Sequence, residues 1–456
     1  MRSQCLSRGW LLPSALFVLL IHFSAAAAPA QGPAHRLRNW PHWRGPQFDG
    51  VAPFGDPPLH WDEQTNVRWK RELPGEGNST PIVWEDLVFV LTAQDTGREG
   101  GAEELAALRL AAADQKTVPP GKFVDLQVLA VDRSTGATRW QVTAAQFLPR
   151  EGLHPANTYA SASPITDGQR LFVSFGSRGL FCYDLSGKLL WRRDSGPMRT
   201  RAGWGEGASP ALWRNTLFVN CDQEAGSHLL ALDAATGEQR WRVDRDEPTS
   251  WSTPLVVERP QGTQVITSAT RRVRSYHAET GDVIWSCEGL TTNVISSPVA
   301  DADAVYCMSS YGDSAVLAIP LDARGELTAD QLRWTFTQAA PYGPSPLLAD
   351  NRLYLTRGKA SVVLSLDTQT GKPVWPLSRL PEAASDLFAS PVAAAGRIYF
   401  LAADGTTAVL RLGDTFESLA VNRLDEQFEA SPAIVGRQMF LRGRRHLYCL
   451  EEPPSQ

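Results

Sequence analysis

The chain has 456 residues and a formal net charge of −5, with 49 acidic residues against 44 Lys and Arg. It lacks the excess of positive charge with which proteins neutralise nucleic-acid phosphates, so nucleic acid is excluded as the expected partner. A chain of this length often forms two or three domains, but the repeat described below predicts a different organisation.

The first 30 residues have the pattern of a secretory signal peptide. Arg2 and Arg8 supply positive charge, an apolar run follows over 11–23, and small residues lead to a cleavage pattern near Ala30. The run is shorter than the ~20 residues that span a bilayer, although an uncleaved anchor is the alternative. We therefore expect an exported protein, periplasmic or extracellular, without a transmembrane segment in the mature chain. Residues 31–65 form an N-terminal extension.

A short phrase recurs along the rest of the chain. It consists of a small residue, then Ser or Thr, then Pro, then a short apolar run. Its eight copies end at Pro81, Pro164, Pro210, Pro254, Pro298, Pro346, Pro391 and Pro432. From the second copy onward the prolines lie 41 to 48 residues apart. A period of this length with strand-like content predicts the blades of a β-propeller.

Each repeat has the same internal order. A first strand follows the proline, and turns separate it from a second and a third strand. The third strand ends near an aspartate, which is followed by a Thr-Gly turn as at 233–237. A fourth strand then carries a tryptophan, at Trp140, Trp191, Trp241, Trp285, Trp334 and Trp375. Tryptophan at one fixed place in each repeat indicates a structural wedge between neighbouring sheets. The seventh repeat lacks it.

The two ends of the repeat region complement one another. Trp69 lies before the first Ser-Thr-Pro, in a fourth strand that lacks the preceding three. The last repeat, 431–450, has three strands and no fourth. Pairing the two closes the ring and removes exposed sheet edges. The predicted fold class is all-β: an eight-bladed β-propeller of four-stranded antiparallel blades over 66–450, with a tail at 451–456. Seven blades is the alternative, if one degenerate repeat folds differently.

An insertion at 94–123 interrupts the first repeat between its second and third strands. Residues 102–113 are rich in Ala, Leu and Glu and have partial helical patterning. We expect the insertion to emerge on the face that carries the channel mouth. It is a lid or a docking helix, with a disordered surface loop as the alternative.

The cysteines show no motif for zinc or for covalent haem. After the signal segment five remain, at Cys182, Cys221, Cys287, Cys307 and Cys449. Most stand inside apolar strand patterns, which favours buried thiols that pack as small hydrophobes. The alternative is that two of them form one disulfide, because an exported protein can reach an oxidising compartment.

The phrase at 233–241, DAATGEQRW, resembles the PQQ-like repeat of quinoprotein dehydrogenases and of BamB-type outer-membrane assembly propellers. The resemblance covers about 66–450. The opening at 40–46, WPHWRGP, is similar to that of exported PQQ-like propellers of planctomycete-type bacteria. The repeat implies the fold, whereas function has to be argued from a site.

A quinone-dependent dehydrogenase is the enzymatic alternative that the resemblance implies. Such enzymes hold the quinone beneath a disulfide of adjacent cysteines, on a Trp floor, beside a calcium ion. This sequence has no adjacent cysteines and no haem-attachment motif, so neither PQQ nor calcium is predicted as a cofactor. It also lacks the HExxH, GxSxG and P-loop motifs. No catalytic, cofactor-binding or metal residue is therefore predicted.

The segments that enter each first strand are aromatic and polar, and in a propeller they surround the channel mouth. Loops on such a scaffold often carry function. The predicted binding residues are Asn157, Tyr159, Arg201, Trp204, Glu206, Trp251, Asn293, Tyr342 and Phe388. The alternative is that they only plug the channel. The predicted function is a non-catalytic, monomeric, BamB-like scaffold of the periplasm or cell envelope that binds a protein partner. Polysaccharide or small-ligand binding is a further alternative.

Overall fold

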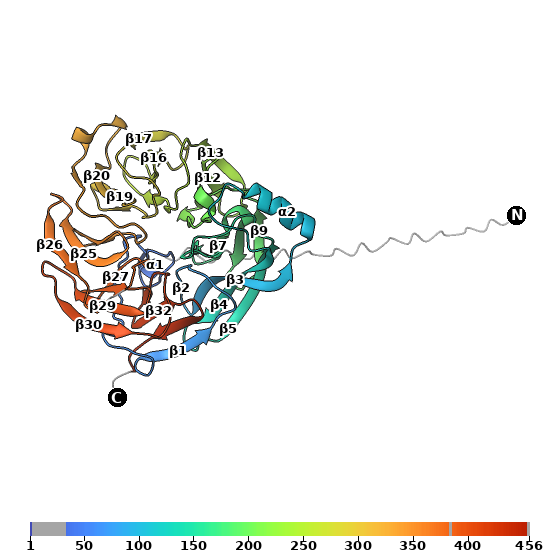
Figure 1. Cartoon of the computed structure of the whole chain (residues 1–456), viewed down its shortest axis with the longest axis horizontal. Coiled ribbons are helices and arrows are strands. Elements are labelled where there is room, and N and C mark those ends of the chain that lie inside the picture. Colours follow the sequence, from blue (N-terminus) through green and yellow to red (C-terminus); the bar gives the residue numbers. More distant parts are fainter. Residues whose placement is uncertain (2–32, 383–384, 454–456) are drawn as a thin grey trace. The chain divides into compact units, whose positions relative to one another are not determined.

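Eight sheets are arranged in a ring about a central axis (Figure 1). The computed structural model describes residues 1, 33–382 and 385–453, so the predicted signal peptide lies outside the described part apart from its first residue. Seven sheets have four strands and one has five. The eight-bladed prediction is confirmed, and the seven-bladed alternative is wrong.

The blades are numbered here in chain order, each from its innermost to its outermost strand. Blade 1 contains β2 (Ile82–Trp84), β3 (Leu87–Glu99), β4 (Lys122–Asp132) and β5 (Thr138–Phe147). Blade 2 contains β6 (Ile165–Thr166), β7 (Arg170–Ser174), β8 (Leu180–Asp184) and β9 (Leu189–Arg193). Blade 3 contains β10 (Ala211–Trp213), β11 (Thr216–Cys221), β12 (His228–Asp233) and β13 (Gln239–Asp244). Blade 4 contains β14 (Leu255–Val257), β15 (Gln264–Thr267), β16 (Val273–His277), β17 (Val283–Cys287) and, parallel to β17, β21 (Gly325–Leu327).

The second half of the ring repeats this plan. Blade 5 contains β18 (Val299–Ala300), β19 (Ala304–Ser309), β20 (Ala315–Pro320) and β22 (Trp334–Phe336). Blade 6 contains β23 (Leu347–Ala349), β24 (Arg352–Arg357), β25 (Ala360–Asp367) and β26 (Pro373–Arg379). Blade 7 contains β27 (Val392–Ala394), β28 (Arg397–Leu401), β29 (Thr406–Arg411) and β30 (Ser418–Arg423). Blade 8 contains β31 (Ala433–Val435), β32 (Gln438–Arg442), β33 (His446–Leu450) and β1 (Val67–Glu72).

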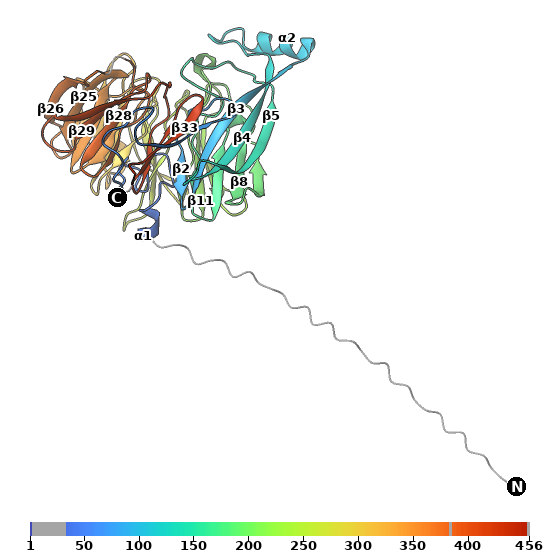
Figure 2. The same ribbon diagram turned by 90° about the horizontal axis from the view of Figure 1, so that it is seen from below.

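Helical segments are few. They are α1 (Pro33–Arg36), α2 (Ala102–Ala111) and the 3₁₀ turns Gly176–Arg178, Arg201–Gly203 and Ala329–Gln331. The two α-helices lie toward opposite ends of the channel axis, with α1 at the centre of the ring in the axial view (Figures 1 and 2). Among the described residues, no helix combines the length and the apolar character that crossing a bilayer needs.

Blade 8 closes the ring as the sequence predicts. Strand β1 pairs antiparallel with β33, with Trp69 opposite Cys449 and Val67 opposite Leu450. The N-terminal and C-terminal ends of the repeat region therefore share one sheet, in which β1 covers the edge of β33.

Most of the outer-strand tryptophans wedge against the following blade. The indole N–H of Trp140 donates to the carbonyl of Leu185 at 2.8 Å, and that of Trp69 donates to Arg133 at 3.0 Å. The ring of Trp140 lies against Gly187, which has a φ of +91°. A Cβ at Gly187 would come within 2.7 Å of the indole, so the turn requires glycine for its dihedral and for its contact. Trp285 departs from the pattern and donates to Gln264 at 3.3 Å.

The extension supplies the tryptophan that blade 7 lacks. Ala420 stands opposite Val409, the register position that tryptophan holds in other blades. Trp61, which is 4% exposed, instead stacks on Tyr399 with ring centroids 6.2 Å apart. Asn422 fixes this segment by accepting the backbone N–H of Trp61 at 3.0 Å. Trp61, which lies outside the repeats, thus takes the place of the tryptophan that blade 7 lacks.

The same extension blocks one end of the channel. Trp40 pairs with Val83 of blade 1, and Val51 pairs with Ala393 of blade 7. Between them Arg44 is buried and donates to the carbonyls of Pro346 and Pro391. Its burial lowers the pKa of the guanidinium to about 10. The channel plug is therefore residues 39–56, and its contacts reach inner strands on several sides of the ring.

The recurring Ser/Thr-Pro phrase has a direct structural cause. In every blade the backbone N–H of the Ser or Thr donates to the hydroxyl oxygen of the equivalent residue in the next blade. The eight bonds measure 2.8–3.2 Å, and the last, from Ser431 to Thr80, closes the circle. We call these residues the hydroxyl ring: Thr80, Ser163, Ser209, Thr253, Ser297, Ser345, Ser390 and Ser431.

The five cysteines of the described chain are all buried and free. Burial raises the pKa of the Cys182 thiol to about 12, which keeps it protonated and unreactive at neutral pH. The structure thus agrees with the prediction of packed thiols and shows no disulfide among the described residues.

Removing one hydroxyl of the ring should destabilise the whole propeller. Ser297→Ala leaves the buried N–H of Thr253 without its acceptor, now 2.9 Å away, and should cost about 1–3 kcal/mol. Ser297→Thr keeps the hydroxyl and should restore most of that stability. The measurement is urea unfolding, with Ser418→Ala, an exposed serine, as the control. Equal midpoints for Ser297→Ala and Ser418→Ala would refute a structural role for the ring.

Removing the Trp61 side chain should also lower the free energy of unfolding measurably. Trp61→Ala should destabilise the protein by about 3–5 kcal/mol, because a large buried ring leaves a cavity beside Tyr399. Phe54→Ala is the matched control, since Phe54 belongs to the same extension and is 50% exposed. The control should change the unfolding free energy by less than about 1 kcal/mol.

Candidate binding site at the channel mouth

The inner strands all start at the same end of the channel, just after the hydroxyl ring. The loops that precede them meet there and enclose a cavity of about 230 Å³. All eight residues of the hydroxyl ring line it, together with Trp43 of the channel plug. Aromatic side chains form its walls: His154, Trp204, Trp251, Tyr342 and Phe388. The cavity therefore has a polar ring at its base and aromatic walls.

The structure brings together some of the predicted binding residues and separates others. Asn157, Trp204, Trp251, Tyr342 and Phe388 line the central cavity. Tyr159 and Glu206 line a neighbouring cavity of about 60 Å³ instead.

Arg201 and Asn293 line neither of these two cavities. Asn293 is buried at a φ of +58°, and the backbone N–H of Arg201 donates to the hydroxyl of Thr249. The sequence predicted which loops form the mouth, but it did not predict that Trp43 lines the base of the cavity. The Ser/Thr-Pro phrase was interpreted as a mark of strand starts, although the phrase also lines the cavity.

The wall around Trp204 is held by hydrogen bonds to backbone carbonyls. Asn157 donates to the carbonyl of Trp204 at 2.8 Å and to that of Glu206 at 3.2 Å. The indole N–H of Trp251 donates to Gly205 at 2.7 Å. Trp204 also lies 6.3 Å from Trp251 and 5.9 Å from His154, measured between ring centroids. The Trp204 loop and the Trp251 indole are thus held in place before any ligand arrives, which lowers the entropic cost of binding.

The opposite wall is formed by Tyr342 and Phe388. Tyr342 packs on Tyr311 with centroids 5.6 Å apart, and its burial raises the pKa of the phenol. The ammonium of Lys359 lies 5.4 Å from the centre of the Phe388 ring. Both aromatic side chains are half-buried, so part of each remains at the surface of the mouth.

The insertion stands beside this mouth. The N–H of Lys116 donates to Ala202 at 3.0 Å, and the hydroxyl of Thr117 donates to Gly203 at 2.6 Å. Helix α2 projects beyond these contacts (Figure 2) and buries none of its residues. The segment after the helix is therefore docked on the Trp204 loop, while the helix itself has no buried residue.

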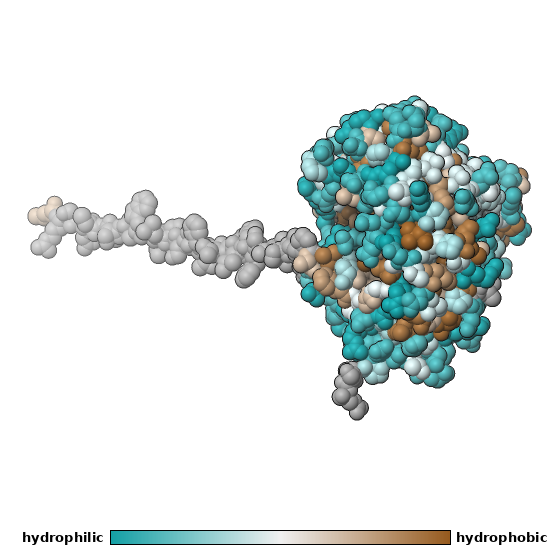
Figure 3. Space-filling view, turned by 90° about the vertical axis from the view of Figure 1, so that its left-hand side faces the viewer, coloured by the Kyte–Doolittle hydropathy of each residue, from teal (hydrophilic) through white to brown (hydrophobic). Residues whose placement is uncertain are grey.

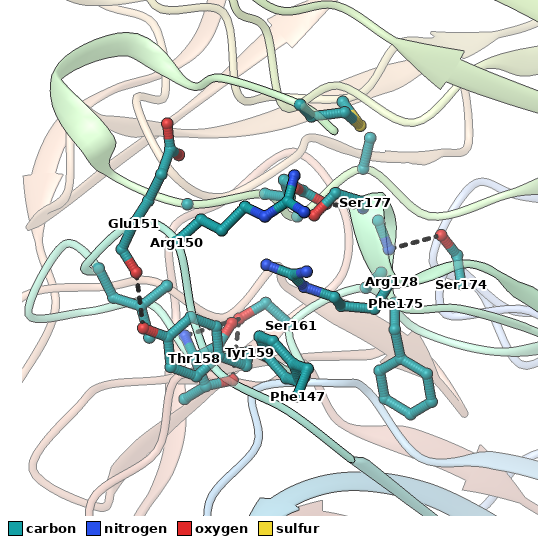
Figure 4. A pocket seen from close by; sticks show the side chains of 18 of the residues that line it. Phe147, Arg150, Glu151, Thr158, Tyr159, Ser161, Ser174, Phe175, Ser177 and Arg178 are labelled. Atoms are coloured by element: carbon teal, nitrogen blue, oxygen red, sulfur yellow. Dashed lines mark hydrogen bonds between the residues drawn. The ribbon is translucent and has the colours of Figure 1, made fainter. Parts of the chain in front are cut away.

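The smaller cavity lies between the loops of blades 1, 2 and 3 (Figure 4). Tyr159 donates to the carbonyl of Glu151 at 2.8 Å and meets Phe147 edge to face. The guanidinium groups of Arg150 and Arg178 both point into the space (Figure 4), and that of Arg178 lies 4.2 Å from the Phe147 centroid.

Glu206 borders the same space. Its carboxylate accepts the N–H of Ser177, and desolvation raises its pKa to about 7. A Cβ on Gly176 would overlap this carboxylate at 1.3 Å, so a side chain at that position would expel it.

The central cavity does not fit the cofactors of quinone-dependent enzymes. Pyrroloquinoline quinone carries three carboxylates, yet the residues that line the cavity include no Arg or Lys. Calcium and similar ions take six to eight oxygen ligands, carboxylates prominent among them. The lining offers one carboxylate, Glu429, which already accepts bonds from Gln427 and Arg444. Within the described ranges, no cluster of three His, Cys, Asp or Glu is placed to hold a metal ion.

The raised pKa of Glu206 should appear in the pH dependence of stability. Its folded pKa of about 7 exceeds the ordinary value of 4.5, so the folded protein binds the proton more tightly than the unfolded chain does. Stability attributable to this group is therefore present below pH 4.5 and is lost as the pH rises through 7. Arg178 opposes the shift, whereas Glu151 adds to it.

Glu206→Gln should remove this contribution. Relative to the wild type, the variant should gain roughly 1–3 kcal/mol of stability between pH 5 and pH 8. Urea midpoints at several pH values measure it. Glu238→Gln changes an exposed glutamate, and its stability should vary with pH in parallel with that of the wild type. Other buried acids such as Asp49, whose pKa is raised to about 6, are unchanged in all three proteins. A Glu206→Gln curve parallel to the wild type would contradict the shift.

Comparisons with known proteins agree with the geometry. A family model described as outer membrane protein assembly factor BamB matches residues 125–376 and 321–446. The BamB protein of Shewanella oneidensis is 24% identical over 234 residues, which cover 48% of this chain and 56% of that relative. This chain thus spans about half the length of the curated relative that it matches.

Solved structures show the same fold at low identity. A europium-containing methanol dehydrogenase is 10% identical, with a TM-score of 0.61 over 91% of this chain and 98% of that one. A quinohemoprotein alcohol dehydrogenase from Comamonas testosteroni is also 10% identical, with a TM-score of 0.59 over 92% of this chain and 82% of that one. These two likenesses concern the fold alone. The family-model match extends over most of the blades, and the chain belongs to the BamB family of PQQ-like propellers.

Proposed function

We propose that this protein is a non-catalytic binding scaffold of the cell envelope that holds a protein partner on the loops of its channel mouth. Family membership supports the envelope location, because the matched model and the Shewanella relative are both described as outer membrane protein assembly factors. The pattern of a signal peptide at 1–30 supports export. The scaffold acts as a single propeller.

The observation that carries the proposal is the group of fixed aromatic side chains at the mouth. His154 is exposed, while Trp204, Trp251, Tyr342 and Phe388 are half-buried. Aromatic residues supply much of the binding energy in protein interfaces, especially where they are rigid and partly desolvated. The hydrogen bonds from Asn157 and Trp251 to backbone carbonyls provide that rigidity.

Helix α2 extends the same face outward. Leu110 is 79% exposed on it, and Val118, in the segment that follows, is 71% exposed. By contrast, the outer wall on the side of β25 and β26 is largely hydrophilic with separated hydrophobic spots (Figure 3). Apolar side chains that stay in water next to an aromatic rim extend the predicted contact surface from the mouth to the helix.

The dehydrogenase alternative draws no support from the cavity. Its lining has no Arg or Lys for the carboxylates of a quinone, and it offers a metal ion only one carboxylate, Glu429, which is already paired. The saccharide alternative concerns the space beneath the rim.

Site-specific photo-crosslinking tests the proposal. A photoreactive phenylalanine at Tyr342 or Phe388 should crosslink in living cells to one and the same envelope protein. The control position is Glu238, in the turn at the opposite end of blade 3. That turn is joined to the far end of the inner strand by the bond from Ala234 to Asn215. Glu238 should give no such product.

A mutation checks that the rim provides affinity. Trp204→Ala should lower the yield of the Tyr342 crosslink at least tenfold, which corresponds to about 1.4 kcal/mol. Phe54→Ala should leave it unchanged, because Phe54 belongs to the N-terminal extension, outside the mouth. Equal crosslinking from Glu238, or a yield unaffected by Trp204→Ala, would contradict the assignment of the partner to the mouth.

A further inference from the structure

We infer that the cavity beneath the rim binds one uncharged, hydroxyl-rich ring of monosaccharide size. This goes beyond the proposed scaffold function, because the ligand occupies the space below the surface that a protein partner would contact. The inference rests on the hydrogen-bonding capacity, the charge, the aromatic surfaces and the size of the cavity.

The hydroxyl ring presents donors that the protein does not use. Each of its oxygens accepts a backbone N–H from the neighbouring blade at 2.8–3.2 Å. A hydroxyl that accepts such a bond keeps its own hydrogen to donate. Across the described residues, none of these eight hydroxyls donates to a protein acceptor, and all eight line the cavity. The base of the cavity therefore carries a circle of O–H donors for an acceptor-rich ligand.

The lining is almost without charge. It contains no Arg or Lys, and its single carboxylate, Glu429, is 3% exposed as a side chain and paired with Arg444. Burial raises the pKa of Glu429, while its bonds with Arg444 and Gln427 act in the opposite direction. Transferring an ion from water into such a site costs free energy that no partner charge repays. The cavity thus favours a neutral ligand over an anion or a cation.

Aromatic faces and hydroxyl donors together match the two kinds of surface on a sugar ring. The negative face of an aromatic ring attracts polarised hydrogens, and the C–H groups on one side of a pyranose are such hydrogens. Trp43 at the base and Trp204 with Trp251 on the wall line the cavity and supply its aromatic surface. The oxygens around the edge of the pyranose then meet the hydroxyl ring.

The size of the cavity limits the ligand to one ring. Cavities for drug-sized ligands measure about 300–1,000 Å³, whereas this one measures about 230 Å³. The channel plug occupies the other end of the axis, with Trp43 as its contribution to the lining. A chain of sugars would therefore enter from the mouth with its terminal residue only.

Ligand-observed NMR on the full-length protein tests this inference. The probes are the methyl glycosides of glucose, galactose, mannose and N-acetylglucosamine, with glucuronate and glucosamine as charged partners of the same size. At least one neutral glycoside should show saturation transfer and compete with the others. The charged pair should bind at least tenfold more weakly. Transfer to none of the neutral probes, or equal binding of the charged ones, would overturn the inference.

Three variants locate the binding. Trp204→Ala removes an aromatic face, and Thr253→Val removes one donor while keeping the shape of the side chain. Each should weaken binding at least tenfold, and circular dichroism confirms that each is folded. Phe54→Ala, outside the cavity, should bind as the wild type does. If both cavity variants bind normally, the ligand lies elsewhere and the inference is wrong.

The outcome is separable from that for the scaffold. Crosslinks from Phe388 to an envelope protein do not require the sugar, and sugar binding to the purified protein does not require the partner. A crosslinked partner peptide whose side chain fills the cavity and resists displacement by saturating glycoside would identify a peptide as the occupant and would overturn the saccharide assignment.

Discussion

The circle of eight hydrogen bonds around the channel is the interaction on which the rest of the structure depends. In each bond a backbone N–H of one blade meets a side-chain oxygen of the next, so every blade is fixed to its neighbour at the same height. The residues of the circle are 2–6% exposed, and a buried N–H without an acceptor is costly. The requirement applies to every repeat, which explains why Ser or Thr recurs before proline.

The blades, the ring closure and most of the tryptophan wedges follow from periodicity, and the sequence predicted them; Trp61 in blade 7 is the exception. Trp69 pairs opposite Cys449 as expected because an incomplete repeat at each end leaves only one way to satisfy the edge strands. Periodicity did not reveal that residues 39–56 form a plug at one end of the channel. That segment has no period, and its placement depends on contacts with residues some 300 positions later in the chain, such as the bond from Arg44 to Pro346.

The candidate site was predictable in position and only partly in composition. Reading the segments before each first strand placed Asn157, Trp204 and Tyr342 correctly at the mouth, because inner strands of a propeller start at one end. The direction in which a loop side chain points is set by local dihedrals, which a repeat does not specify. Asn293 is buried at positive φ and lines neither cavity, and Glu206 lines the smaller cavity between the blades.

The extension also bears on how the chain reaches its native state. Trp61 packs on Tyr399 and Arg44 binds Pro391, although these partners are synthesised more than 300 residues later. The N-terminal extension is thus among the last segments to pack, because blades 6 and 7 have to form before it can contact them. Contacts so distant along the chain slow folding and leave apolar surface uncovered in the meantime. Closure of this propeller is therefore a late, cooperative step that brings the N-terminal extension and the last blades together. Until that step the apolar side chains of the extension stay in water, so the folding chain needs protection from aggregation.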